Sequence, residues 1–143
     1  HPRALPQAVP NSFVEWMKAG EIDLVVTHPK GYELAPQVMR EQKPEYDQTK
    51  AFERADFIYA KNWSSYNNYG KILKPDFDWK VTATKMAQTN AAKFMHCLPV
   101  RRNVVVDDAV IDSPDSIVIE QAANRIVSMQ TVLKNILEKW NLF

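Results

Sequence analysis

Residues 95–103, Met-His-Cys-Leu-Pro-Val-Arg-Arg-Asn, hold the side chains best suited to chemistry. A short strand is expected to end at the start of this segment, and the proline interrupts ladder pairing directly after it. An imidazole, the backbone carbonyls of Cys97 and Leu98, and the pair Arg101 and Arg102 would then face a ligand crevice. Carbonyls accept hydrogen bonds from an amine or amide, and guanidinium groups clamp a carboxylate or phosphate. From the residues alone, a solvated basic turn is the favoured interpretation of the two arginines.

The remaining residues do not form the pattern of a nucleotide or metal site. The three glycines stand far apart, so no glycine-rich turn brings backbone close to a pyrophosphate. The histidines, His1, His28 and His96, do not fall at zinc spacing, and one cysteine cannot make a thiolate site. For each histidine alone a structural role is favoured. Cys97 as a nucleophile lacks a recognisable base and a group to orient that base.

Length, charge and cysteine content restrict the class of protein. The chain has 143 residues, 45% of them hydrophobic, which is enough for one domain with a core. A formal net charge of +1 gives no long-range attraction to nucleic acid or to an anionic membrane. The single cysteine excludes an internal disulfide and fits a reducing compartment, and no apolar run approaches the roughly 20 residues of a membrane span. We therefore expect a cytoplasmic protein.

Short apolar runs alternate with helical patterns along the chain. Strands are expected over residues 22–27, 56–60, 93–96 and 116–119. Helices are expected over residues 13–18, 34–42, 49–55 and 82–89, and a last helix with an apolar stripe over about 121–140. This alternation predicts an α/β fold with a Rossmann-like parallel sheet, flanking helices and a long C-terminal helix. Because ligands bind beyond the carboxyl ends of such strands, the opening loop and the loops after Thr27, Ala60 and Met95 are the candidate sites.

The order of residues around this segment is similar to that of a known enzyme family. Residues 96–99, His-Cys-Leu-Pro, resemble the hallmark of ornithine-type carbamoyltransferases, whereas aspartate carbamoyltransferases carry His-Pro-Leu-Pro. Residues 100–103 resemble the branch that acts on N-acylornithines, since ordinary ornithine enzymes usually continue Ala-His-Arg-Gly. The resemblance extends through residues 31–34, the loop that contains Trp63 and residues 120–125, and so covers nearly the whole chain.

The resemblance implies that residues 1–143 are a C-terminal, acyl-ornithine-binding domain. The family's Ser-X-Arg-Thr loop and His-Pro-X-Gln segment belong to an N-terminal carbamoyl phosphate domain, and this sequence contains neither. A chain that opens at His1 is therefore expected to be an excerpt of a longer polypeptide, inactive by itself, with a naturally processed chain as the alternative. The family implies a homotrimer with active sites between subunits, and a last helix that packs on the other domain.

The family's reaction is attack of a substrate amine on carbamoyl phosphate, with release of phosphate and no metal, cofactor or covalent intermediate. The enzyme's task is to position the reactants and to stabilise the developing charge. The resemblance assigns Cys97 and Leu98 as the catalytic pair whose backbone carbonyls hold the reacting amine or the carbamoyl amide. It assigns Arg125 to carbamoyl phosphate, with a structural salt bridge as the alternative, and makes His96 supporting structure.

Residue 61 bears on the identity of the amine. When this chain is aligned with ordinary ornithine enzymes on Trp63, Lys61 stands at the position of a family aspartate. The resemblance implies that this aspartate pairs with the α-ammonium of ornithine. Two positive charges would repel each other by on the order of 1 kcal/mol or more when partly buried. Acylation removes the charge of the α-nitrogen, and Lys61 then complements the substrate carboxylate; a surface lysine beside a shifted alignment is the alternative. His1 and Arg101 resemble further acyl-ornithine contacts.

The residues after the Arg-Arg-Asn turn bear on the identity of the acyl group, because they differ from those of acetylornithine enzymes. Acetylornithine enzymes typically place a modified lysine shortly after the Arg-Arg-Asn turn, where residues 104–106 of this chain are Val-Val-Val. We therefore expect carbamoyl phosphate and N-succinyl-L-ornithine as substrates, with N-acetyl-L-ornithine next. The alternatives are an ordinary ornithine carbamoyltransferase, an enzyme for putrescine or aspartate, and a non-catalytic α/β module that binds an amino acid.

Overall fold

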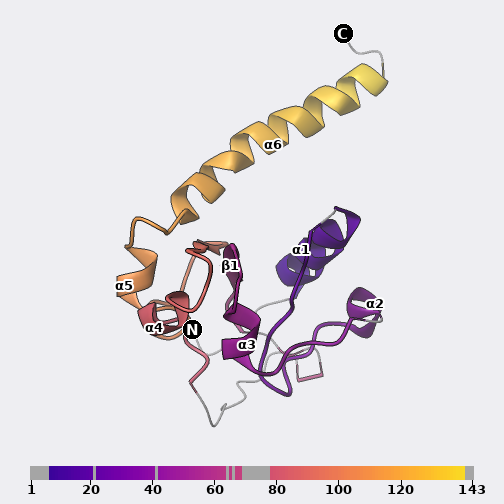
Figure 1. The fold of residues 1–143 in the computed structure, drawn as a ribbon. Helices are drawn as coiled ribbons and strands as arrows, with labels where there is room; N and C mark the ends of the chain where they lie inside the picture. The colour runs from indigo at the N-terminus through magenta and orange to yellow at the C-terminus, as the bar shows by residue number, and fades with distance from the viewer. Residues whose placement is uncertain are drawn as a thin grey trace.

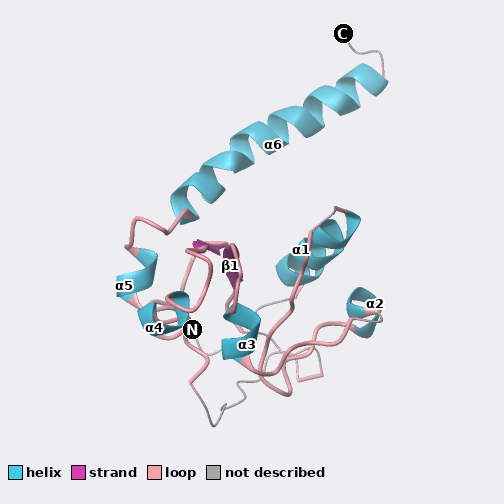
Figure 2. Ribbon diagram, viewed as in Figure 1, coloured by secondary structure: helices cyan, strands magenta, loops and turns pink. Residues whose placement is uncertain are grey.

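A computed structural model describes residues 7–20, 22–40, 42–63, 65, 67–68 and 78–140. Helices and strands follow one another along this part of the chain, joined by long loops (Figures 1 and 2). In chain order they are α1 (Ala8–Ala19), α2 (Pro36–Met39), α3 (Gln48–Phe52), β1 (Phe57–Ala60), α4 (Ala83–Met86), β2 (Lys93–His96), α5 (Asp108–Ile111) and α6 (Val118–Lys139).

The sheet in the described part of the chain is parallel. β1 and β2 lie side by side, with Ala60 opposite His96. On the other edge of β2, the Phe94 N–H donates to the Asp115 carbonyl at 2.8 Å and the Phe94 carbonyl accepts from the Ile117 N–H at 2.9 Å. β2 is therefore hydrogen-bonded on both edges, as expected of a buried strand. The prediction of an α/β fold with a parallel sheet, flanking helices and a long C-terminal helix is confirmed.

The predicted strand over residues 22–27 is wrong. The structure has a single parallel bridge there, between Thr27 and Glu45, and no strand. The side chains of Leu24 and Val26 pack against a small core that α1 and α2 form with Ala35. A loop that packs only Leu24 and Val26 against the core, with Ile22 and Val25 exposed, therefore produced the strand-like pattern, since a short apolar run does not identify its own secondary structure.

The predicted strand over residues 116–119 is also wrong, and the last helix begins earlier than expected. One bridge joins Ser116 to Phe94, and the chain then enters α6 at Val118. An apolar run of isoleucine and valine fits a strand or the first turn of a helix, which explains the misplaced boundary. Val118 is buried, so this run fastens the start of α6 to the body.

Two of the short helices begin at a side-chain cap. The Asp47 carboxylate accepts from the backbone N–H groups of Thr49 and Lys50 at 3.0 and 3.3 Å and so caps α3. The Thr82 hydroxyl accepts from the Lys85 N–H at 3.3 Å at the start of α4. α2, α3 and α4 are shorter than the predicted helices, α1 begins before its predicted start, and α5 was not predicted.

A hydrophobic core joins the sheet to α3, α5 and the start of α6. Its buried members are Phe52, Ile58, Val81, Ala92, Phe94, Val106, Val110, Ile111 and Val118. Phe94, in the middle of β2, is fully buried. This core fixes the two strands whose carboxyl ends carry the predicted site.

α6 runs away from the rest of the chain. Figure 1 shows the helix leaving the body near the sheet and extending to the C-terminus. It packs against β2, and of its residues only Val118 is buried. The predicted apolar stripe is present but uncovered within the described residues: Ile126, Met129, Val132, Leu133 and Ile136 are 45–66% exposed.

Candidate functional site

Three loops meet beyond the carboxyl ends of the strands. The loop after β1 is tied to the turn before α2, because the Ser65 hydroxyl donates to the Gly31 carbonyl at 2.6 Å. The same loop is tied to the turn after β2 through Asn62, whose Nδ2 donates to the Pro99 carbonyl at 3.0 Å. Asn62 is 5% exposed, so this contact is sheltered from water. Three of the four loops that the sequence selected are thus brought together, and the opening loop lies largely outside the described residues.

Lys61 and Cys97 leave the sheet side by side, because the residues before them, Ala60 and His96, are register partners. Cys97 is partly buried, and Leu98 is 44% exposed. Lys61 is partly buried, and its ammonium is close enough to lower the pKa of His96. The structure therefore places Lys61, Cys97 and Leu98 at one edge of the sheet, as expected from parallel strands.

The imidazole of His96 does not face this edge. The residue is 1% exposed, and neither ring nitrogen makes a well-aligned hydrogen bond within the described residues. Burial lowers the pKa of His96 to about 4; the Lys61 ammonium acts in the same direction, and the nearby backbone of Cys97 opposes both in part. The ring is therefore neutral at neutral pH, and the expectation that it would face a ligand crevice is wrong.

A polar network links β1, β2 and α6 behind the strand ends. The Gln121 Oε1 accepts from the backbone N–H of His96 at 3.0 Å. The Tyr59 hydroxyl hydrogen-bonds the side chains of Cys97 and Gln121. Burial raises the pKa of Tyr59 to about 12, Cys97 raises it as well, and the hydrogen bond with Gln121 lowers it. Tyr59 is therefore protonated at neutral pH and can donate to the Cys97 Sγ.

The two arginines of the turn after β2 have different surroundings. Arg102 forms ion pairs with Asp108, at 2.7 Å, and with Asp112 at the end of α5. These hydrogen bonds raise the pKa of Arg102 and lower the pKa values of both carboxyl groups. The Asn103 side chain is held by Asp108 as well. Arg102 therefore fastens the turn to α5, and the expectation that both arginines face the ligand is wrong for Arg102; Arg101 is partly buried.

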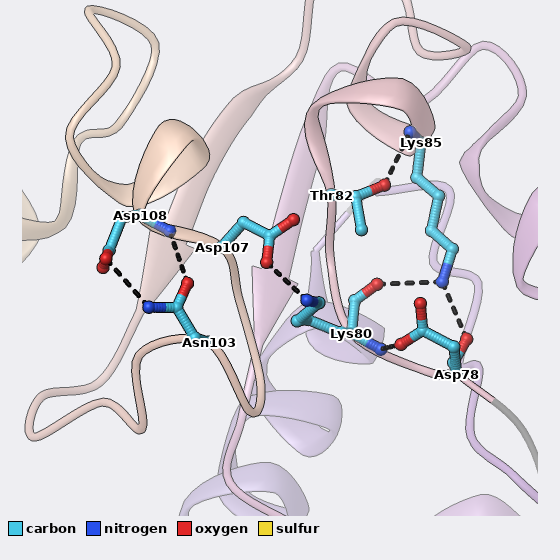
Figure 3. A network of polar contacts seen from close by, with 7 residues as sticks. All are labelled: Asp78, Lys80, Thr82, Lys85, Asn103, Asp107 and Asp108. Carbon is cyan, nitrogen blue, oxygen red and sulfur yellow. Dashed lines mark hydrogen bonds and ion pairs between the residues drawn. The ribbon is translucent and has the colours of Figure 1, made fainter.

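A second set of contacts fixes the same turn to the segment before α4 (Figure 3). The Lys80 ammonium pairs with the Asp107 carboxylate at 2.7 Å, and this hydrogen bond raises the pKa of Lys80. The Lys85 ammonium donates to the backbone carbonyls of Asp78 and Lys80, both at 2.8 Å. The turn that carries Arg101 is thus linked to α5 through Arg102 and to the segment before α4 through Asp107.

Arg125 lies on α6, one helical turn after Gln121. Its side chain is exposed, and none of the ion pairs among the described residues involves it. Its role in binding carbamoyl phosphate stays a prediction. His1, the other predicted substrate contact, lies outside the described residues.

Two negative findings apply to the described part of the chain. No three side chains of His, Cys, Asp or Glu gather there into a group that could hold a metal ion. No helix there combines the length and the apolar character needed to cross a bilayer.

Sequence reasoning missed Tyr59, Asn62 and Gln121. A signal for Tyr59 existed: a tyrosine in an apolar strand that is even partly buried needs a partner for its hydroxyl. Its register partner is Met95, and Cys97, two residues further, points to the same face of the sheet. Asn62 gave no signal, because its partner is a carbonyl whose place depends on the path of the loop after β2.

Comparison with known families gives one match that covers most of the chain. The model described as "Aspartate/ornithine carbamoyltransferase, Asp/Orn binding domain" matches residues 6–136. The match includes both strands, the three loops at their carboxyl ends, and α6 as far as the turn before its end.

Several similar proteins fall in the N-acylornithine branch. N-succinylornithine carbamoyltransferase of Bacteroides thetaiotaomicron is 64% identical over 140 residues, which cover 96% of this chain and 44% of the relative. N-acetylornithine carbamoyltransferase of Xanthomonas campestris pv. campestris is 32% identical over 151 residues, which cover 93% of this chain and 44% of the relative. A crystal structure of an N-acetyl-L-ornithine transcarbamylase variant, complexed with carbamyl phosphate and N-succinyl-L-norvaline, aligns with a TM-score of 0.72 and 33% identity over 87% of this chain and 43% of that one. The chain thus spans less than half the length of the relatives it matches.

Proposed function

Because the chain belongs to the aspartate/ornithine carbamoyltransferase family as an Asp/Orn binding domain, we propose that the whole protein carbamoylates an N-acylated ornithine. The donor is carbamoyl phosphate, the acceptor is the side-chain amine, and N-succinyl-L-ornithine is preferred to N-acetyl-L-ornithine. The relatives named N-succinylornithine carbamoyltransferase support this preference. The reaction is a step of arginine biosynthesis, and we expect it in the cytoplasm.

The observation that carries the proposal is the position of Lys61 beside Cys97. The two residues leave neighbouring strands at one level, so a substrate whose amine is held by the carbonyls of Cys97 and Leu98 has its other end within reach of Lys61. An ammonium in this place suits a carboxylate and repels a free α-ammonium. Acylation of the α-nitrogen removes that repulsion and leaves the carboxylate to be bound.

The chemistry needs positioned groups more than reactive side chains. The lone pair of the substrate amine forms a bond to the carbamoyl carbon, the carbonyl oxygen becomes an oxyanion, and the bond to the phosphate oxygen then breaks. Phosphate leaves with that electron pair, and the proton lost by the amine passes to phosphate or to water. The carbonyls of Cys97 and Leu98 accept from N–H groups of the reactants and hold them in line. His96, neutral and buried, is not assigned a proton transfer.

Two arginines serve the anions in this proposal. Arg101, in the firmly held turn after β2, binds the acyl-ornithine, and a succinyl group supplies a carboxylate for a guanidinium to meet. Arg125, exposed on α6, binds carbamoyl phosphate from this half of the protein. His1 completes the proposed acyl-ornithine contacts.

The rest of the protein supplies what residues 1–143 lack. We assign to it the main phosphate-binding loop and a surface that covers the exposed apolar stripe of α6, which the described residues leave open. The relatives are more than twice as long as the part that this chain matches, which leaves room for such a domain. The assembly we propose is a homotrimer with active sites between subunits.

The full-length protein tests the proposal. Phosphate release is measured with carbamoyl phosphate and, in separate assays at equal concentration, N-succinyl-L-ornithine, N-acetyl-L-ornithine and ornithine. We expect the highest rate with the succinyl compound, and the lowest with ornithine. Fastest turnover of free ornithine would make the protein an ordinary ornithine carbamoyltransferase, and binding of an amino acid without any phosphate release would make it a non-catalytic module.

A further inference from the structure

The side chain of Gln121 makes a hydrogen bond to β2 that a backbone carbonyl of a neighbouring strand would otherwise make. On the edge of β2 next to α6, the Phe94 N–H donates to the Asp115 carbonyl and the Phe94 carbonyl accepts from the Ile117 N–H. In a continuing parallel ladder the next donor, the His96 N–H, would bond to the Ile117 carbonyl. That carbonyl accepts from the backbone N–H of Gln121 at 2.9 Å instead, because α6 has begun. The Gln121 side chain takes the vacated place and accepts from the His96 N–H at 3.0 Å.

The same side chain reaches β1. The Gln121 side chain lies close enough to the Tyr59 hydroxyl for a hydrogen bond that lowers the pKa of Tyr59. Tyr59 in turn hydrogen-bonds the Cys97 side chain. One carboxamide therefore holds the last residue of β2 through its backbone and holds Cys97 through Tyr59. Both contacts are made by the two ends of one planar group, and the contact with the His96 N–H needs only an acceptor.

Gln121 also lies between the two groups assigned to the reactants. Cys97 and Leu98 directly follow the residue that it holds, and Arg125 is one turn further along the same helix. We propose that Gln121 is a positioning residue: it fixes the separation between the carbonyls that hold the amine and the arginine that binds carbamoyl phosphate. This inference rests on the proposed function, since it concerns the alignment of those two reactants.

The expected signature is a loss of kcat with little change in KM. Without Gln121, each reactant keeps its own contacts, so the KM values for acyl-ornithine and carbamoyl phosphate should each stay within about threefold. The alignment of the two reactants is lost, and small misplacements of reacting groups lower rates by on the order of 10-fold to 100-fold. A residue that merely supports the fold would lower the thermal midpoint and leave kcat per folded molecule unchanged.

The experiment compares three variants of the full-length protein. Gln121→Met keeps the length of the side chain and removes both hydrogen bonds; we expect kcat to fall at least tenfold. Gln121→Glu keeps an acceptor for the His96 N–H and can accept from the Tyr59 hydroxyl, so kcat should recover to within about threefold of the parent. Gln130→Met makes the same change at an exposed position of α6 and should leave kcat unchanged. An unchanged kcat in Gln121→Met, or no recovery in Gln121→Glu, overturns the proposal.

A second measurement is independent of activity. The exchange rate of the His96 amide hydrogen, read by NMR, should rise at least tenfold in Gln121→Met and stay near the parent rate in Gln130→Met. Unchanged protection overturns the proposed clamp whatever the kinetics show. If Gln121→Met does not fold, Gln121→Asn takes its place, because the shorter amide keeps the chemistry but not the reach, and an unchanged kcat there overturns the proposal equally. If the parent protein transfers no carbamoyl group, the proposed function fails, and the amide measurement still decides whether Gln121 fixes the end of β2.

Discussion

At the scale of single residues, the proposed preference for an acylated substrate rests on Lys61. Lys61 sits beside Cys97 at the strand ends and is partly buried, so its charge acts on a ligand with less screening than a surface charge. Lys61→Asp replaces an attraction to the substrate carboxylate by a repulsion. We expect turnover of acyl-ornithine to fall at least tenfold, a factor that corresponds to about 1.4 kcal/mol, in steady-state assays of the full-length protein.

Lys61→Met separates the charge of Lys61 from its packing, because methionine keeps much of the aliphatic stem. Most of the loss should appear in this variant too, and a rise in activity with free ornithine is expected in Lys61→Asp alone. If both variants kept acyl-ornithine kinetics within about twofold of the parent, Lys61 would be a bystander, and the surface-lysine interpretation would hold.

The arginines should divide their work between the two substrates. Arg101→Ala should mainly weaken acyl-ornithine binding and Arg125→Ala mainly carbamoyl phosphate binding, each by roughly 1.5–3 kcal/mol for a lost charge-assisted contact. Arg102→Ala is the comparison for a loosened turn: its guanidinium is engaged by Asp108 and Asp112, so its loss should weaken acyl-ornithine binding less than Arg101→Ala does and should leave carbamoyl phosphate binding unchanged. Separate titrations of the two ligands measure the effects, and equal losses for both ligands in both variants would contradict the division.

His96 should make the fold sensitive to acid. Its pKa is about 4 in the folded protein, below its ordinary value of 6.5, so between these values the unfolded chain binds a proton that the folded chain does not. Stability is therefore fully present above about pH 6.5 and falls as the pH drops toward 4. Protonation of carboxylates such as Asp108, which pairs with Arg102, also lowers the stability at lower pH. The part of the stability loss that comes from His96 must therefore be measured against a control variant.

The control variant is His96→Gln, which cannot titrate. The urea midpoint of the parent should fall more steeply between pH 7 and pH 4.5 than that of the variant, by an amount that corresponds to on the order of 2 kcal/mol. Parallel pH profiles for the two proteins would show that His96 has the same pKa in the folded and the unfolded chain, so that burial does not keep the imidazole neutral.

At the scale of elements, the contact between the two loops at the strand ends should be separable from general stability. Asn62→Ala removes the hydrogen bond to the Pro99 carbonyl and loosens the turn that carries Cys97, Leu98 and Arg101. We expect the KM for acyl-ornithine to rise at least threefold, since one buried hydrogen bond contributes about 1 kcal/mol.

Asp47→Ala provides the control for the Asn62 variant. It removes the N-cap of α3, away from the strand ends, at a similar cost of about 1 kcal/mol in stability. Thermal unfolding should show both variants destabilised, while the KM for acyl-ornithine changes in Asn62→Ala alone. A rise in KM in Asp47→Ala as well would mean that the site responds to stability in general.

The sequence was sufficient for the elements that are both paired and buried. The strands 56–60 and 93–96 were predicted within one residue, because apolar β-branched and aromatic side chains there match a strand paired within the sheet. The strand predicted over 22–27 failed, since an apolar loop that packs only every second side chain against the core leaves the same pattern. α5 was missed because its four residues are set by tertiary contacts, among them the ion pairs of Asp108 and its neighbours with Arg102.

The candidate site divides in the same way. The carbonyl pair and Lys61 could be placed from parallel-strand topology, since the carboxyl ends of neighbouring strands meet at one edge. Which of Arg101 and Arg102 faces the ligand could not, because that depends on where α5 puts its carboxylates. The burial of His96 depends on side chains from several elements, so it could not be predicted from the residues next to it in the sequence.

At the scale of the whole molecule, residues 1–143 should not catalyse the reaction alone. The domain carries the proposed amine-binding carbonyls and the arginine proposed to bind carbamoyl phosphate, and we assign the main phosphate-binding loop to the other domain of the proposed full-length protein. Expressed alone, the chain should form no acyl-citrulline from carbamoyl phosphate and acyl-ornithine at any concentration of either substrate. Mass spectrometry of the reaction mixture measures this, and product formation by the isolated chain would contradict the assignment of two domains.

The exposed helix α6 should decide how well the isolated domain resists proteolysis. Beyond Val118 its backbone is held by no buried side chain, so opening of the helix toward its C-terminal end has a low free-energy cost. A protease should therefore remove the C-terminal turns of an isolated domain quickly and leave the sheet intact, whereas a covered α6 should resist. Arg125, which we propose binds carbamoyl phosphate, lies near the start of α6 and should stay in place when the C-terminal turns are removed.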